Sequence, residues 1–171
     1  MDDTFISGTD SVKLLLEMEE EDAVQITFTS LIKYKINKLM EVLGKFDFSY
    51  YLIFKDCNLG ITLSKKLIGE LSKSEIRIIW LNLDDNGIND DSVYAINHLI
   101  QKKEIKYLSI AVNDYSNTQI SLSVASIKKM IDIIESSKLL YLNLFGNNGH
   151  DFNIESEINE IIRKREVIAA S

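Results

Sequence analysis

The residues of this 171-residue chain that could do chemistry are few and lie far apart along the sequence. The two histidines are His98, between Asn97 and Leu99, and His150, which follows a glycine in a turn-like segment. A histidine that acts as an acid, a base or a metal ligand needs a positioned partner or further ligands, and the spacing shows none beside either ring. His98 falls in a segment with helical spacing and is predicted to be a surface residue.

The single cysteine, Cys57, cannot form a disulfide within the chain, which is consistent with a reducing compartment. As a nucleophile its thiol would need a nearby base, and no histidine lies at a suggestive spacing from it. The alternative is a structural role as a weak hydrogen-bond donor.

The acidic and glycine-containing segments do not match the motifs of metal or phosphate sites. Asp84, Asp85, Asp90 and Asp91 could attract Ca²⁺, but they lack the fixed spacing of a calcium loop. The segment 146–149 contains two glycines without the Lys and hydroxyl residue that follow the last glycine of a phosphate-binding loop. The sequence therefore predicts no cofactor and no metal, and it favours a non-catalytic protein.

Composition points to one globular domain over residues 1–171. Hydrophobic residues make up 46% and charged residues 26% of the chain, which excludes a disordered protein. The net charge of −7 disfavours nucleic acid and anionic membranes as partners, because both require clustered Lys and Arg. The only apolar run near the N-terminus, 14–16, is interrupted by Glu17, so we expect neither a signal peptide nor a membrane span and predict synthesis in the cytoplasm.

The elements that would position these side chains follow from an internal repeat. Three segments superimpose without gaps, each with apolar residues at its first, fourth and sixth positions and Asn at its ninth. They are Ile78–Asn86, Ile105–Asn113 and Leu139–Asn147. Two earlier segments fit the same frame, with Cys57 and Leu31 in the Asn position. The central apolar residues are Ile26, Leu52, Leu81, Leu108 and Leu142, at intervals of 26, 29, 27 and 34 residues.

This frame resembles the leucine-rich-repeat family, specifically its ribonuclease-inhibitor-like class, over residues 23–151. The resemblance implies an α/β, right-handed leucine-rich-repeat solenoid of about five strand–helix repeats, with a parallel sheet on the concave face and helical caps. Two departures stand out: Leu31 cannot do what an Asn does, and the 34-residue interval implies a loop insertion around Ser116–Ser121.

Local patterns support the same architecture. Alternation around Leu81 is typical of a strand with one buried face, and apolar stripes at helical spacing follow each strand. The stripes are Ile36, Leu39, Met40 and Leu43; Leu63, Leu67 and Leu71; Val93, Ile96, Leu99 and Ile100; and Val124, Ile127, Ile131 and Ile134. Where the chain leaves a strand, Asn86, Asn113 and Asn147 can pair backbone groups that lose their ladder partners.

Both ends are predicted to be caps. Residues 1–22 would contain a helix over Ser11–Glu21, with an acidic end that is either solvated or in contact with a basic partner. Residues 152–171 would form a C-terminal capping helix on the stripe of Ile154, Ile158, Ile161 and Ile162.

Stacking of the repeats places an aromatic residue just before the central leucine in four successive strands. Tyr and Trp are enriched at binding hot spots, although the rings could also only stack on one another. The outward positions that we predict to bind a partner are Tyr51, Ile53, Lys55, Trp80, Asn82, Asp84, Tyr107, Ser109, Tyr141, Asn143 and Phe145.

The sequence therefore favours a protein–protein interaction module that binds a partner on its concave sheet. The alternatives are a small α/β enzyme and a structural protein that forms homo-oligomers through its open ends. Similar small repeats occur in bacterial proteins that act on host cells, and the richness in Ile, Asn and Lys fits an AT-rich genome, so a bacterial effector or regulator, exported to a host cell, is the expected context.

Overall fold

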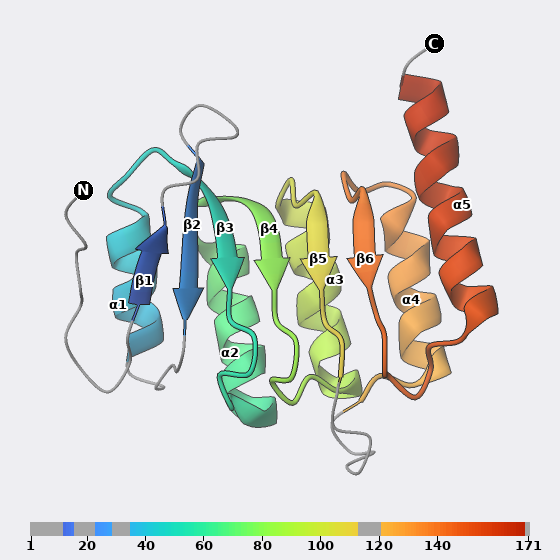
Figure 1. The fold of residues 1–171 in the computed structure, drawn as a ribbon, viewed down its shortest axis with the longest axis horizontal. Helices are drawn as coiled ribbons and strands as arrows, with labels where there is room; N and C mark the ends of the chain where they lie inside the picture. The colour runs from blue at the N-terminus through green and yellow to red at the C-terminus, as the bar shows by residue number, and fades with distance from the viewer. Residues whose placement is uncertain (1–11, 16–22, 29–34, 113–120, 170–171) are drawn as a thin grey trace.

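The computed structural model describes residues 12–15, 23–28, 35–112 and 121–169, in which strands and helices alternate (Figure 1). The strands are β1 (Val12–Leu15), β2 (Ala23–Phe28), β3 (Ser49–Ile53), β4 (Arg77–Asn82), β5 (Tyr107–Ser109) and β6 (Tyr141–Asn143). The helices are α1 (Lys35–Leu43), α2 (Gly60–Lys73), α3 (Val93–Lys102), α4 (Val124–Ile134) and α5 (Phe152–Ala169), with a short 3₁₀ helix, η1 (Asp90–Ser92), before α3.

The strands form one sheet in sequence order, β1-β2-β3-β4-β5-β6. Neighbours from β2 to β6 pair in parallel, whereas β1 pairs antiparallel with β2. Helices α1 to α4 lie behind the sheet in Figure 1, and α5 lies beside β6. The other face of the sheet, on which Tyr51, Trp80, Tyr107 and Tyr141 lie, carries no described helix, and we call it the open face. The predicted alternation of parallel strands with helices is confirmed.

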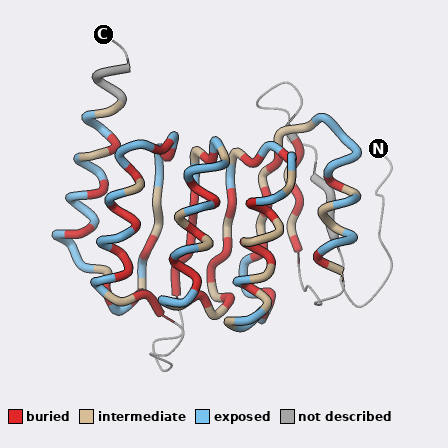
Figure 2. Tube along the Cα trace, turned by 180° about the vertical axis from the view of Figure 1, so that it is seen from behind, coloured by how far each residue is buried: buried red, intermediate tan, exposed pale blue. Residues whose placement is uncertain are grey.

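The core lies between the sheet and the helices. Of the central apolar residues, Ile26, Leu52, Leu81 and Leu108 are buried, whereas Leu142 in the last strand is half-buried. Buried and exposed positions alternate turn by turn along the helices in Figure 2, as the predicted stripes require. Full burial of one such side chain contributes about 1.5–3 kcal/mol, so this layer dominates the stability of the fold. One predicted stripe residue departs from the pattern: Val124, at the start of α4, is exposed.

The turns that follow the strands repeat the same backbone geometry. Four residues after the central leucine, Asp56, Asp85 and Gly146 all have positive φ angles, of 53°, 59° and 79°. The ladder between strands continues into these turns, since the N–H of Asp56 donates to Asp84 O and the N–H of Asp85 donates to Ala111 O. The chain therefore leaves three of its strands in the same way.

The recurring Asn residues pair the backbone at these turns, as predicted. The side-chain amide of Asn86 donates to Phe54 O of the preceding strand segment, and its Oδ1 accepts from Cys57 N at 3.0 Å. Asn147 donates in the same way to Ile110 O at 2.9 Å. Asn113 lies outside the described residues.

Cys57 occupies the equivalent position one repeat earlier. Its Sγ donates to Phe28 O at 3.1 Å, and the residue is buried. The structural role predicted for the thiol is confirmed by this contact. Burial also separates the sulfur from the solvent that a nucleophile would need to share with a substrate.

Two cations join neighbouring helical layers. The ammonium of Lys103, just after α3, donates to Ser74 O and Ile76 O behind the end of α2. The guanidinium of Arg165 in α5 donates to Ile134 O and Leu139 O around the end of α4. Positive groups at helix C-termini satisfy carbonyls that have no partner within the helix, so each layer stabilises the end of the one before it.

The two ends of the sheet differ from one another. The helix predicted over Ser11–Glu21 is wrong, since Val12–Leu15 forms β1 and residues 16–22 lie outside the described residues. Pairing with β1 satisfies the outer edge of β2, which a helix would have left without backbone partners. The helix predicted at the C-terminus is confirmed as α5, in which Ile154, Ile158 and Ile162 are buried.

Several other expectations fall on residues that are not described, namely the part of the cap over 1–11, Leu31 and the core of the insertion at 116–120. Within the described part of the chain, no helix combines the length and the apolar character needed to cross a membrane.

Candidate functional site

The aromatic residues of the open face lie opposite one another on neighbouring strands. The register pairs Tyr51 with Trp80, Trp80 with Tyr107, and Tyr107 with Tyr141. We call these four residues the aromatic column. Each sits one residue before a central leucine, so alternation along the strand turns the leucine into the core and the ring to the open face.

Tyr51, Trp80 and Tyr107 of the aromatic column contact their neighbours ring to ring and still leave surface exposed. The centroids of Tyr51 and Trp80 lie 6.3 Å apart, and those of Trp80 and Tyr107 lie 6.0 Å apart, with interplanar angles of 60° and 48°. Trp80 is 39% exposed, Tyr107 38% and Tyr141 49%. A shallow hollow of about 740 Å³ lies against the column and is also lined by Ile79, Lys106 and Leu140.

Toward the carboxyl ends of the strands, polar side chains of the open face bond to one another. Ser109 Oγ donates to Asp84 Oδ1 at 2.6 Å, and the backbone N–H of Ala111 donates to the same oxygen at 2.8 Å. Asn82 Nδ2 donates to Asp84 Oδ2 at 3.1 Å, and Asn143 Nδ2 donates to Ser109 Oγ at 3.0 Å. We call Asn82, Asp84, Ser109 and Asn143 the polar network. It fixes the spacing of β4, β5 and β6 through side chains.

The two asparagines of the polar network also cap their own strands. Asn82 Oδ1 accepts from Asp84 N at 3.0 Å, and Asn143 Oδ1 accepts from Phe145 N at 3.0 Å. Such side chain to backbone bonds, two residues apart, favour the turn that ends each strand. The same residue type therefore makes the same local turn in two repeats.

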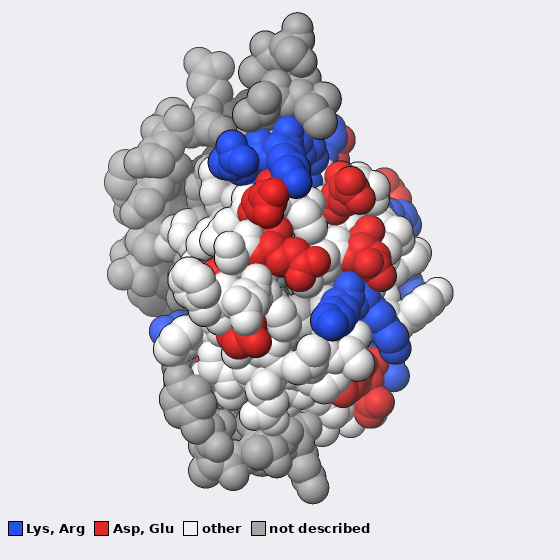
Figure 3. Space-filling view, turned by 90° about the vertical axis from the view of Figure 1, so that its right-hand side faces the viewer, with Lys and Arg blue, Asp and Glu red and all other residues white. Residues whose placement is uncertain are grey.

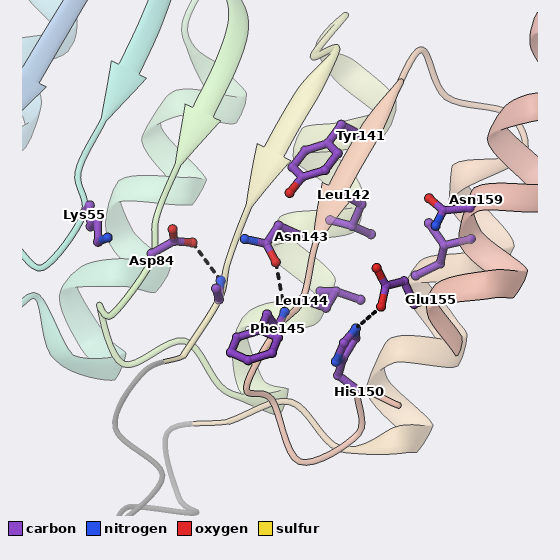
Figure 4. Close-up of a pocket in the computed structure, with 12 residues that line it drawn as sticks. Lys55, Asp84, Tyr141, Leu142, Asn143, Leu144, Phe145, His150, Glu155 and Asn159 are labelled. Atoms are coloured by element: carbon purple, nitrogen blue, oxygen red, sulfur yellow. Dashed lines mark hydrogen bonds and ion pairs between the residues drawn. The ribbon is translucent and has the colours of Figure 1, made fainter. Parts of the chain in front are cut away.

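A second hollow, of about 470 Å³, runs from the polar network around β6 to the first turns of α5 (Figure 4). On the α5 side, His150 Nε2 lies 3.6 Å from Glu155 Oε2, and the His150 ring packs edge-on against Phe145. Sequence spacing showed no partner for His150, and the structure supplies Glu155. Tyr141 lines both hollows, so they form one continuous surface.

The structure brings the predicted partner-binding residues onto one face but does not expose them all. Asp84 and Ser109, at 7% and 5% exposure, are buried, which corrects the expectation that they face a partner. The exposed residues are Lys55, Trp80, Tyr107, Tyr141 and Phe145, and the half-buried ones are Tyr51, Ile53, Asn82 and Asn143. Asp84 and Ser109 bond to each other, and Asn143 bonds to Ser109, so these side chains lie against the sheet. The spacing of residues in the sequence could not reveal these bonds.

Sequence reasoning missed the residues that border the two hollows from outside the strand frame. Ile79, Lys106 and Leu140 flank the aromatic column at its amino-terminal side, and Glu155 and Asn159 approach from α5. The only sequence signal for them was position: the first three each lie one residue before an aromatic residue, and Glu155 and Asn159 lie one turn apart in the last helix.

The open face offers aromatic surface and hydrogen-bonding groups, which suit binding. In the described part of the chain, no group of three or more His, Cys, Asp or Glu side chains is arranged to hold a metal ion. His98 is exposed and its Nδ1 lies 2.5 Å from Ser72 Oγ, away from the open face on α3.

Compared with known proteins, the chain matches no protein-family model and no curated protein sequence.

Proposed function

We propose that this chain is a leucine-rich-repeat module that binds a partner protein across its open face. The single observation that carries the proposal is the aromatic column, which presents exposed rings on adjacent strands. Trp80, Tyr107 and Tyr141 are the anchors, because buried aromatic anchors supply most of the free energy in typical interfaces. Lys55, Asn82, Asn143 and Phe145 adjust the choice of partner around them.

The repeat geometry supports the family part of the proposal. The central apolar residues recur on successive parallel strands, and the Asn or Cys side chain that follows bonds to the preceding strand segment in the same manner each time. Helices lie on one side of the sheet, as a right-handed solenoid with a concave sheet requires. A doubly wound enzyme sheet would be covered by helices on both faces.

Binding explains the exposure of the rings better than stacking does. A cross-strand aromatic pair contributes about 0.2–1 kcal/mol to sheet stability. The rings of Trp80 and Tyr107 meet at 48°, so much of each ring face stays in water instead of covering its neighbour. Covering these faces with a partner removes apolar area from water at about 25 cal/mol per Å².

Affinity capture with matched variants tests the proposal. Wild-type protein, Trp80→Ala and Tyr94→Ala are immobilised and exposed to the same lysate, and captured proteins are identified by mass spectrometry. Tyr94 is 83% exposed on α3, on the helical side of the molecule, and serves as the control for loss of a surface ring. A true partner is retained by Tyr94→Ala and lost by Trp80→Ala.

The affinity of that partner is then measured by calorimetry. Removal of an aromatic anchor at the centre of an interface costs about 2–4 kcal/mol, which weakens binding by about 30-fold or more. Equal affinities of the wild type and Trp80→Ala would reject the aromatic column as the binding site.

A further inference from the structure

The edge of β6 that faces away from β5 and the adjacent turns of α5 form a groove that shares only Tyr141 with the aromatic column. β6 is the last strand of the described sheet. Tyr141 N donates to Lys106 O and Asn143 O accepts from Ile110 N, so these residues direct their backbone groups to β5. Because alternate residues of a strand point to opposite edges, Leu142 directs both its N–H and its C=O away from β5, toward the groove.

The lining of the groove suits an added strand. Leu142 is half-buried, and the buried Ile158 of α5 lines the same hollow. Glu155 and Asn159 line the same hollow on the side formed by α5. An extended peptide could pair with the backbone of Leu142 while alternate side chains rest on Leu142 and Ile158.

Charge at this end of the molecule indicates what the peptide carries. Figure 3 shows this end of the molecule, with acidic side chains over its centre and basic side chains at the top and on the right of the view. Glu155 and Glu157 are exposed in the first two turns of α5, while exposed Arg163 and Lys164 lie in its second half. Lys55 lines the far side of the same hollow, across β6 from α5 (Figure 4), so the part of the groove beside Glu155 favours a basic side chain.

A second copy of this chain fits the groove less well than such a peptide. Pairing of β6 with β6 of another copy would bring two Glu155 side chains to one groove, where like charges repel. It would also join strands of three residues each, which is a small contact for a stable dimer.

We infer that the edge of β6 binds an extended peptide with alternating apolar and basic side chains, which adds to the sheet as a further strand beside α5. Main-chain hydrogen bonds to Leu142 hold the peptide, apolar side chains contact Leu142 and Ile158, and a Lys or Arg pairs with Glu155. Of the aromatic column only Tyr141 also lines this site, so removal of Trp80 tests the column without changing the groove lining.

The test uses blocked hexapeptides of alternating valine and lysine, and of alternating valine and glutamate. Binding to the full chain is followed by NMR, with hydrogen exchange at the Leu142 amide as the readout of strand addition. We expect the lysine peptide to slow that exchange at least tenfold and to bind at least tenfold more tightly than the glutamate peptide.

Three variants make the test specific. Glu155→Lys weakens binding of the lysine peptide about tenfold. Glu157→Lys changes the charge of the helix equally but lies outside the groove lining, so it weakens binding far less. Trp80→Ala leaves the affinity for this peptide unchanged. Equal binding of both peptides, unchanged exchange at Leu142, or protection of Leu142 by self-association without peptide would overturn the inference. Failure of the aromatic column to bind a partner would leave these results unaffected, so the two proposals fail separately.

Discussion

The two halves of the open face use polar and aromatic side chains in opposite ways. Toward the amino ends of the strands, rings of the aromatic column contact neighbouring rings and water. Toward the carboxyl ends of the strands, the polar network and the turn asparagines form their hydrogen bonds with other groups of the chain itself. Asp84, a carboxylate, is more deeply buried than Trp80, an indole.

This difference separates residues that hold the repeats together from residues that are available to a partner. A buried polar group costs free energy unless it is bonded, so the polar network and the turn asparagines stabilise the fold only as a complete set. An exposed ring carries no such requirement, and its removal leaves no unsatisfied group behind. Substitutions in the two halves should therefore act on different quantities.

The largest loss of stability is expected for Asn86→Ala. Its side chain bonds to Cys57 N, Phe54 O and Asp84 O, all in buried surroundings. Removal takes this partner from Cys57 N and Phe54 O, while Asp84 O keeps its bond from Asp56 N, so we expect the free energy of unfolding to fall by about 3 kcal/mol. Denaturation in urea measures the change.

Asn37→Ala provides the control, because Asn37 is exposed on α1 and the change should alter stability by less than about 0.5 kcal/mol. A loss at Asn86 no larger than at Asn37 would show that the turn amides are not what joins the repeats.

Asp84→Ala should have the next largest effect. Its carboxylate accepts from Ser109 Oγ and Ala111 N, which tie the end of β4 to β5 and the turn after it, and from Asn82 Nδ2 of β4. We expect a loss of about 2 kcal/mol in the free energy of unfolding, smaller than for Asn86 because one of the three donors, the half-buried Asn82 side chain, can turn to water. Asp132→Ala, at an exposed position of α4, is the control.

The strands, their core-facing leucines and the turns that follow them could be predicted from the sequence, whereas the surface of the open face could be predicted only in part. The frame around Leu52, Leu81 and Leu108 specifies strand, face and turn together, because alternation and the following Asn or Cys depend on the same register. The aromatic column follows from that register by counting one residue back. The cross-strand pairing of Tyr51, Trp80, Tyr107 and Tyr141 was therefore predicted correctly.

What failed depends on interactions between repeats or at the ends. Spacing places Asp84 and Ser109 on the open face, but only their mutual bond makes them buried. Apolar spacing at Val12 and Leu15 fits a helix, yet an unpaired edge of β2 favours the strand that lies there. The contact between His150 and Glu155 joins a turn to the next helix, which no periodic pattern encodes.

Substitution in the aromatic half should change stability little while it abolishes binding. Trp80→Ala removes a ring that is 39% exposed and whose ring contacts are those with Tyr51 and Tyr107, so we expect the free energy of unfolding to fall by about 1 kcal/mol or less. The same urea experiment measures it. A loss as large as that of Asp84→Ala would place Trp80 among the residues that hold the fold.

The smallest effect is the pH dependence expected at Tyr50, which neighbours Tyr51 in β3 but points to the opposite face of the sheet. Its hydroxyl donates to Leu43 O at 2.8 Å, and burial raises the pKa of this hydroxyl above its ordinary value. Below about pH 10 the folded and unfolded chains both keep the proton, so Tyr50→Phe costs only the hydrogen bond, about 1 kcal/mol.

Above that pH the unfolded chain releases the proton before the folded chain does, and wild-type stability falls relative to the variant. The difference in unfolding free energy between wild type and Tyr50→Phe should therefore shrink from pH 8 to pH 10.5, with Tyr94→Phe, at an exposed position of α3, as the control. A difference that stays constant would mean that the buried hydroxyl ionises as readily in the folded chain as in the unfolded one. The contrast between adjacent tyrosines on opposite faces of the sheet would then rest on packing alone.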